Sequence, residues 1–183
     1  MSHLQIFTED DPAAPIAEFS DGIAIAAALT EIGVQFDRWP THDLPEESDG
    51  ESIMAAYAPE IERLKRERGY RTVDVIRLLP DHPERETLRG KFLSEHTHGE
   101  EEVRFFVEGE GLFTLHRDGR VYNLLCTRGD LIGVPAGMRH WFDMGPHPRF
   151  TALRLFVNPD GWVAAFTGDD IAARFPRHEP VPA

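Results

Sequence analysis

The sequence predicts a mainly β protein that carries helices in its N-terminal part. Short runs of strand-forming residues fill the second half of the chain, with glycine-containing turns between them, which is typical of antiparallel sandwiches and barrels. The length of 183 residues suits one hydrophobic core. We therefore expect a single domain over residues 1–183, with a helix-containing part over about 1–89, a barrel core over about 90–157, and a short C-terminal helix and tail.

The N-terminal part begins with a predicted strand over residues 4–7. A helix is expected over residues 23–32, because Ser20 is a favourable N-cap and Gly33 stands where a helix C-terminus prefers glycine. Alternating apolar and polar residues then predict a strand over residues 34–39.

A second helical pattern follows an acidic loop, runs to Arg68 and ends at Gly69. Pro59 interrupts this pattern, so either the helix bends there or Pro59 opens a new helical segment in its first turn. The apolar residues at helical spacing are Ile53, Tyr57, Ile61 and Leu64. The chain then continues with a predicted strand over residues 73–79 and a turn with a short helix over residues 80–86.

The barrel core is expected to consist of strands in close succession. Asp118 and Gly119 between two of these strands are a two-residue hairpin signal. A short helical piece is expected over residues 168–174, and the proline-rich tail over residues 175–183 is expected to be poorly ordered. The predicted strands span residues 92–98, 102–107, 111–117, 121–125, 130–134, 140–144 and 150–157.

Composition restricts the partners of the protein. The formal net charge of −13 argues against nucleic acid, because phosphate binding needs clustered lysines and arginines, and it also disfavours an anionic membrane surface. No apolar run reaches the length of a membrane span, and the first residues lack the pattern of a signal peptide, so we expect a cytoplasmic protein. Cys126 is the single cysteine, which excludes an internal disulfide and a cysteine-based metal cluster.

Potential metal ligands gather in an H-x-H-x3-E pattern that a later histidine follows. Side chains alternate between the faces of a strand, so His96 and His98 point the same way, and Glu102 keeps their parity if no bulge intervenes. His140 on a later strand would complete a set of three nitrogens and one oxygen. Such a set suits Fe, Ni, Mn or Cu in an octahedral geometry with two open positions, rather than structural zinc. The alternative for any one histidine is a polar residue of the barrel wall.

The spacing of these residues resembles the two signature motifs of the cupin superfamily, which implies a double-stranded β-helix (jelly-roll) barrel. The first motif, G-x5-H-x-H-x3-E-x6-G, fits Gly90, His96, His98, Glu102 and Gly109. The second, G-x5-P-x-G-x2-H, fits Gly129, Pro135, Gly137 and His140. This second motif usually continues with x3-N, where Met144 stands, so the chain departs from the germin-like branch without losing a ligand.

More narrowly, the chain resembles the acireductone dioxygenases of methionine salvage, through the phrases SDGIAIAAAL, LRGKFLSEHTHGEEEVRFFVEGEGLF and GDLIGVPAGMRHWFDMG. This resemblance implies that one Fe(II) or Ni(II) ion per monomer is bound by His96, His98, Glu102 and His140. It also implies that O2 reacts with a small molecule, metal-bound 1,2-dihydroxy-3-keto-5-(methylthio)pentene. The products in this family are 4-methylthio-2-oxobutanoate and formate with iron, and 3-methylthiopropanoate, carbon monoxide and formate with nickel.

Two arginines are candidate catalytic cations for an enediolate substrate. Arg104 shares the parity of Glu102 and could hold the substrate dianion, while its alternative role is a salt bridge with Glu102 or Glu108. Arg154 lies on a predicted strand that could face the same interior. Candidate walls of an apolar substrate pocket, which could equally be barrel core, are Phe92, Phe106 and Phe142, and the candidate lid is Trp162.

Other functions and states stay open from the sequence. The alternatives are a cupin isomerase or epimerase that acts on a sugar carbonyl without O2, a cupin dioxygenase for a different substrate, and a binding cupin with a vestigial site. Iron and nickel share the same ligands, so the sequence does not distinguish them. A monomer is expected because no exposed apolar helix face is evident. The histidines expected on the surface or in loops are His42, His82, His116, His147 and His178.

Overall fold

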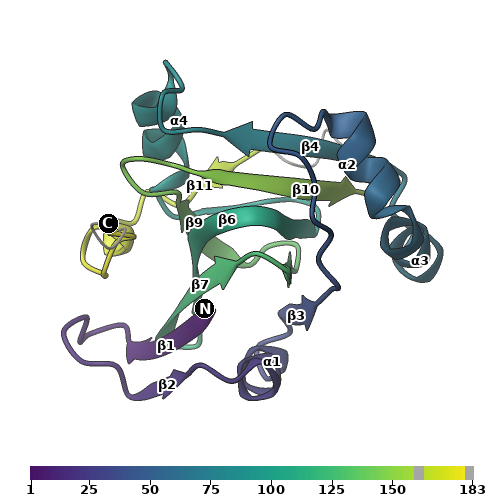
Figure 1. Ribbon diagram of the computed structural model, residues 1–183. Helices are drawn as coiled ribbons and strands as arrows, with labels where there is room; N and C mark the ends of the chain where they lie inside the picture. The colour runs from purple at the N-terminus through teal and green to yellow at the C-terminus, as the bar shows by residue number, and fades with distance from the viewer. Residues whose placement is uncertain (159–162, 180–183) are drawn as a thin grey trace.

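The computed structural model describes residues 1–158 and 163–179 and is built mostly of antiparallel strands (Figure 1). The N-terminal part contains β1 (His3–Thr8), β2 (Ala17–Phe19), α1 (Gly22–Thr30), β3 (Gln35–Arg38), α2 (Gly50–Ala56), α3 (Ala58–Arg68) and β4 (Thr72–Leu78). The chain continues through α4 (Arg85–Phe92), β5 (His96–Thr97), β6 (Glu102–Arg117), β7 (Arg120–Thr127), β8 (Asp130–Val134), β9 (Arg139–Asp143), β10 (Phe150–Phe156), β11 (Ala165–Phe166) and the 3₁₀ turn η2 (Ile171–Ala173).

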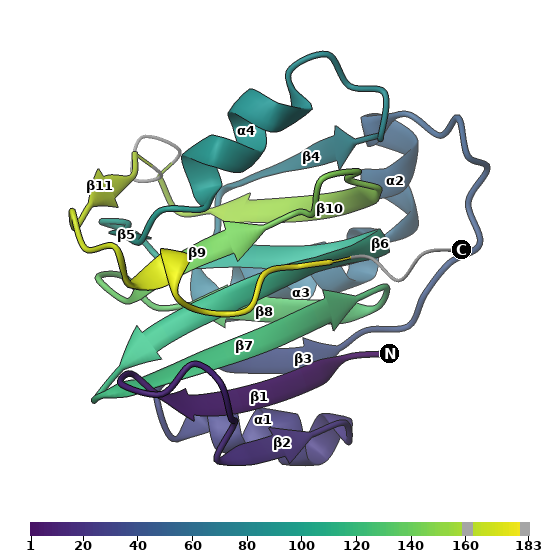
Figure 2. The same ribbon diagram turned by 90° about the vertical axis from the view of Figure 1, so that its left-hand side faces the viewer.

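The long strand β6 joins two layers into a barrel. Its first half pairs with β8 and β10, which in turn pair with β3 and β4. Its second half pairs with β7 and β9, in the strand order β11-β5-β9-β6-β7-β1-β2 (Figure 2). Because one strand belongs to both layers, the residues at the start of β6 lie near residues of β9 and β10.

Glycine allows β6 to pass from one layer to the other. Gly109 has a φ of 73°, and a Cβ at this position would lie 1.8 Å from the carbonyl oxygen of Arg149. Before this point the even-numbered residues of β6, such as Phe106, face the barrel interior. After it the odd-numbered Phe113 and Leu115 do so. The backbone around Gly109 therefore sets which residues of each half face inward.

Gly109→Ala is expected to lower the free energy of unfolding by about 3 kcal/mol or more, because it combines a left-handed φ with a backbone clash. Gly69→Ala is the matched control, since Gly69 has a φ of 78° but nothing within 4 Å of a Cβ. The control should lose only about 1 kcal/mol. Urea unfolding measures both, and equal losses would contradict the role of the close approach to Arg149.

The two faces of the first half of β6 pack against different partners. The inward Phe106 packs against a group of aromatic rings, with centroids 6.1 to 6.5 Å away, namely Phe113, Phe142 and Phe150. The outward face is covered by α2 and α3, which lie side by side against this layer in Figure 1. That outer cluster joins Ile53, Ile61 and Leu64 of the helices, and Tyr57 between the helices, to Val103, Phe105 and Val107 of β6.

The C-terminal segment covers the outer face of the second layer, in front of β9 and β6 in Figure 2. Phe175 is buried, and its ring centroid lies 5.7 Å from that of Phe7. The backbone N–H of His178 donates to Asp143 Oδ2 at 3.0 Å. The prediction of a poorly ordered tail is therefore wrong for residues 175–179, because aromatic burial and this hydrogen bond hold them. Residues 180–183 lie outside the described part of the chain.

Asp143 connects this tail to α4 and predicts a pH-dependent stability. Its carboxylate accepts hydrogen bonds from Arg89 at 2.7 and 3.0 Å. Burial favours the neutral acid, but the bonds from Arg89 and from the N–H groups of Gly145 and His178 outweigh burial and lower the pKa of Asp143. The stabilisation is therefore present above the unfolded pKa of about 3.9 and is lost as the pH falls through the lower folded pKa.

Asp143→Asn is expected to lower the free energy of unfolding by about 2 kcal/mol at pH 7, where the charged hydrogen bonds are intact. The difference in the free energy of unfolding between the variant and the unmodified protein should shrink below a pH of about 4. Asp143 of the unmodified protein then becomes protonated and loses the charged hydrogen bonds that the variant lacks. Urea unfolding at pH 7 and pH 3 measures it. A difference that stays constant between these two pH values would contradict the assignment.

Several predicted boundaries differ from the structure. The predicted strand over residues 92–98 is wrong, because α4 continues through Phe92 and β5 contains only His96–Thr97. The short helix expected within residues 80–86 begins later, at Arg85. Asp21, not Ser20, caps α1: Asp21 Oδ1 accepts from the N–H groups of Ile23 and Ala24, both at 3.0 Å.

Other predicted features are confirmed. A new helix, α3, begins beside Pro59, and Gly69 ends it in the left-handed conformation with a φ of 78°. Asp118 and Gly119 form the predicted hairpin turn, with φ values of 52° and 71°. The expected C-terminal helix is reduced to η2. In the described residues, no helix is long and apolar enough to span a membrane.

Candidate metal centre

Three buried imidazoles converge inside the barrel. His96 on β5 is the register partner of His140 on β9, and His98 follows β5 directly. One ligand nitrogen from each of the three lies within 4.8 Å of the others. The ring centroids are 4.5 to 5.1 Å apart. Such a cluster of nitrogens is a candidate site for a transition metal.

Backbone carbonyls fix the orientation of two of these rings. Nδ1 of His96 lies 2.7 Å from the carbonyl oxygen of Ser94, and Nδ1 of His140 lies 2.8 Å from that of Met138. A carbonyl oxygen can only accept, so each Nδ1 donates and Nε2 remains to act as a ligand. Burial and the nearby His140 lower the pKa of His96 to about 4, which keeps this imidazole neutral at neutral pH.

Glu102 completes the cluster from the first position of β6. Its Oε2 lies 3.0 Å from His140 Nε2 and 3.3 Å from His98 Nε2. Its Oε1 accepts from Arg104 Nη2 at 2.7 Å. Burial favours the neutral acid, but the positive charge of Arg104 and the polar contacts of Glu102 with His140 and His98 hold the pKa of Glu102 well below its usual range. The carboxylate is therefore anionic, and one of its oxygens faces the imidazoles.

A cavity of about 390 Å³ opens onto this cluster. The predicted site residues that line it, apart from the four already described, are Phe92, Arg104, Phe142 and Arg154. Phe106 does not line this cavity but packs in the barrel interior. Trp162 lies outside the described residues. The sequence analysis did not single out three further lining residues, Lys91, Ala164 and Phe166.

The two arginines of the cavity belong to a row of charges across three strands. Arg154 on β10 pairs in register with Arg104 on β6 and with Asp74 on β4. Arg154 donates to the Asp74 carboxylate at 2.8 and 2.6 Å, and Arg104 donates to Glu102. The Arg104 guanidinium also lies 4.8 Å from the centroid of the Phe142 ring. Each arginine is thus held by a carboxylate while it lines the cavity.

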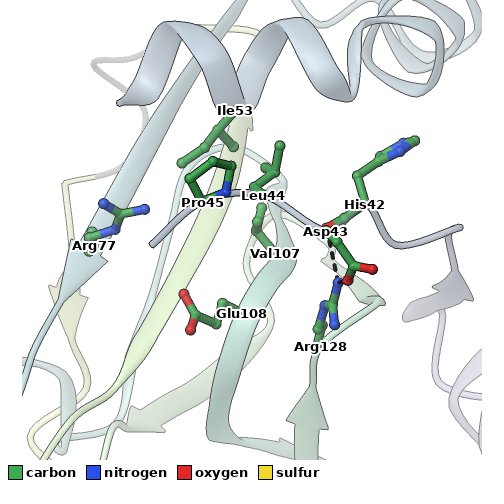
Figure 3. Close-up of a pocket in the computed structure, with 9 residues that line it drawn as sticks. All are labelled: His42, Asp43, Leu44, Pro45, Ile53, Arg77, Val107, Glu108 and Arg128. Carbon is green, nitrogen blue, oxygen red and sulfur yellow. Dashed lines mark hydrogen bonds and ion pairs between the residues drawn. The ribbon is translucent and has the colours of Figure 1, made fainter. Parts of the chain in front are cut away.

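Figure 3 shows a different cavity, of about 160 Å³, which lies beside α2 and beside Val107 and Glu108 of β6. Ile53 and Val107 give it an apolar side, and Arg128 is paired there with Asp43 at 2.9 Å. The imidazole of His42 points away from the other labelled residues. No cluster of metal-ligating side chains is found here within the described part of the chain.

Comparison with protein families assigns the chain. The family described as the ARD/ARD' family matches residues 4–164, which include every residue of the metal cluster. The chain belongs to the ARD/ARD' family. Its relatives include acireductone dioxygenases from Pseudomonas paraeruginosa, with 58% identity over 96% of this chain and 98% of the relative. Another, from Parvibaculum lavamentivorans, is 53% identical over the full length of both chains.

A solved structure of an acireductone dioxygenase has a fold similar to that of this chain. The acireductone dioxygenase from Bacillus anthracis with a cadmium ion in its active center superimposes with a TM-score of 0.78 and 30% identity. The match covers 91% of this chain and 98% of that one. The predicted family, the cupin-type barrel with N-terminal helices, and the enzyme class of a metal-dependent dioxygenase are therefore confirmed for this ARD/ARD' protein.

The lining residues that the sequence analysis missed carry weak sequence signals. Phe166 belongs to β11, a strand of two residues that pairs with β5, and its ring centroid lies 5.8 Å from that of His96. So short a strand has no detectable period. Lys91 lies in α4, which the sequence analysis placed too early in the chain.

Proposed function

We propose that the cluster binds one Fe(II) or Ni(II) ion through His96, His98, Glu102 and His140, and that the protein catalyses the reaction of acireductone with O2. The observation that carries this proposal is the convergence of three imidazoles and one anionic carboxylate on one face of a cavity. The acireductone is 1,2-dihydroxy-3-keto-5-(methylthio)pentene.

The distances from Glu102 to two of the histidines fit a single ion. Ligand atoms on neighbouring corners of an octahedron, each about 2.1 Å from the ion, lie about 3.0 Å apart. Glu102 Oε2 lies 3.0 Å from His140 Nε2 and 3.3 Å from His98 Nε2. The donor set of nitrogens and one oxygen also suits iron or nickel, while a structural zinc site would normally include cysteine. When bound, the ion supplies Lewis acidity and open positions for the two enediolate oxygens of the substrate.

Residues around the metal ligands would fix the orientation of these ligands before the substrate enters the cavity. Arg104 holds Oε1 of Glu102, so that Oε2 faces the histidines and the carboxylate cannot rotate freely. The carbonyl groups of Ser94 and Met138 keep Nδ1 of His96 and His140 protonated. These contacts orient the ligands at no further cost when the ion binds.

The same residues provide for a substrate that is anionic at one end and apolar at the other. Arg104 and Arg154 bring positive charge to the cavity, which favours binding of an enediolate. Arg104 then has two roles, since it orients Glu102 and lies on the wall that the substrate meets. Phe92 and Phe142 would pack against the methylthio group and exclude water from it.

The test is the consumption of acireductone in air by metal-free protein reloaded separately with Fe(II) and with Ni(II). The iron form is expected to give 4-methylthio-2-oxobutanoate and formate. The nickel form is expected to give 3-methylthiopropanoate, carbon monoxide and formate. Loss of substrate no faster than in buffer, for both forms, would contradict the proposed reaction. Turnover that continues without O2 would indicate an isomerase instead.

A further inference from the structure

His116 lies on β6 on the outer face of the second layer, where the sequence analysis expected a histidine on the surface or in a loop. That prediction is wrong, because the side chain is only 3% exposed and is held between two carboxylates. His116 Nδ1 lies 2.7 Å from Glu95 Oε2, and His116 Nε2 lies 3.0 Å from Glu9 Oε2. The Glu95 side chain is fully buried.

The two contacts hold the imidazole from both sides. Each ring nitrogen of His116 lies within hydrogen-bond distance of a glutamate oxygen. Hydrogen bonds between imidazole and carboxyl groups are strong when the groups are ionised. The contacts connect the segment that carries Glu95 to the end of β6.

Glu95 immediately precedes the metal ligand His96, whose strand has little other support. β5 contains two residues and has a single register pair with β9, His96 with His140. Its other neighbour, β11, is also two residues long. Because side chains alternate between faces, Glu95 points to the outer face while His96 points into the barrel. The contact with His116 thus anchors, from behind, the backbone that carries His96.

The backbone of Glu95 joins this anchor to the wall of the cavity. Its carbonyl oxygen accepts from the N–H of Thr167 at 3.1 Å, next to Phe166, which lines the cavity. The contact of Glu95 with His116 therefore connects β6 to two segments beside the metal cluster, the one that carries His96 and the one that carries Phe166.

We propose that His116 is a positioning residue for the metal site, and that it acts through Glu95 to hold His96 in its ligating position. This inference rests on the proposed metal site but not on the identity of the substrate. It predicts that loss of the contact weakens metal binding even though neither His116 nor Glu95 touches the ion.

The experiment measures the affinity of the full-length protein for Ni(II), by competition with a chelator, and the visible absorption of the Co(II)-loaded protein. Glu95→Gln and His116→Gln are each expected to weaken Ni(II) binding by about tenfold, in the range seen when supporting contacts of metal ligands are removed. The Co(II) absorption should change in both variants, because the position of His96 changes. The double variant should bind Ni(II) no more weakly than the single variant with the lower affinity, because the two substitutions break the same contact.

Asp130→Asn is the matched control for general loss of stability. Like Glu95, Asp130 is a buried carboxylate with a basic partner, here the exposed Arg38, whose Nε lies 3.1 Å away, and it accepts from the N–H of Thr127 at 2.8 Å. It contacts no metal ligand in the described part of the chain. It should lower Tm and leave Ni(II) affinity within about twofold, as expected for a distant site. Unchanged Ni(II) affinity in Glu95→Gln and His116→Gln, with Tm lowered as in the control, would overturn the positioning role.

The outcome separates this inference from the proposed reaction. If the unmodified protein binds Ni(II) but does not consume acireductone, the reaction is wrong, while the affinities of the variants still decide the role of His116. If the unmodified protein binds neither Ni(II) nor Co(II), both proposals are overturned.

Discussion

His96→Ala is expected to abolish metal binding and dioxygenase turnover together, while the chain remains folded. The change removes one of three imidazoles from a set that needs all of them to hold an ion with open positions. Turnover should fall by at least about a thousandfold, because the ion supplies several kcal/mol of charge stabilisation. The fold should survive, since the truncated side chain borders an open cavity and not the packed interior.

The measurement combines metal content after dialysis, acireductone turnover and circular dichroism. His147→Ala is the control, because His147 is exposed and lies outside the cavity. A His96→Ala protein that retains turnover without metal would contradict the whole metal-centre account. A variant that keeps metal but loses turnover would restrict His96 to a role in the reaction itself.

Arg104→Met is expected to lower the free energy of unfolding of the metal-free protein by about 3 to 5 kcal/mol, as for a broken buried ion pair. Arg104 and Glu102 are both buried, with side chains 5% and 4% exposed, so the substitution leaves an uncompensated anion. A divalent ion would neutralise that anion. Ni(II) should therefore raise the Tm of Arg104→Met by more than it raises the Tm of the unmodified protein.

A surface pair provides the control for this prediction. Arg68 pairs with Glu101 at 2.8 Å, but their side chains are 43% and 25% exposed. Arg68→Met should lose no more than about 1 kcal/mol and should not alter the response to Ni(II). Urea unfolding with and without Ni(II) measures all three proteins. Equal losses in the two variants would contradict the view that Arg104 balances a buried charge.

Residue parity made much of the barrel predictable from sequence. The alternation of β6 places Val103 and Phe105 under the helices and Glu102 and Arg104 inside, as period-two patterning predicts. The same argument placed Phe142 on the cavity wall. It did not place Phe106 there, because parity gives the face of a strand but not the position along the barrel. Which inward residues meet solvent depends on strand register and on the length of β6.

Other errors arose where tertiary contacts override local preference. α4 contains Gly90, which weakens a helix by about 1 kcal/mol relative to alanine, and the sequence analysis ended the predicted helix before it, at residue 86. Contacts of the helix with the barrel offset this cost: Arg89 binds Asp143, and Leu88 and Phe92 pack against the interior. His116 was mistaken for a surface or loop residue because Glu9 and Glu95, which contact its side chain, are distant in sequence.

The most direct measurement of the central claim is a crystal structure of the Ni(II)-loaded protein with an anomalous difference map at the nickel edge. The account predicts one peak per chain, about 2.1 Å from a nitrogen of each of His96, His98 and His140 and from Oε2 of Glu102, with Oε1 still bound to Arg104. A peak elsewhere, or one that lacks Glu102 while Arg104 keeps the carboxylate turned away, would contradict it.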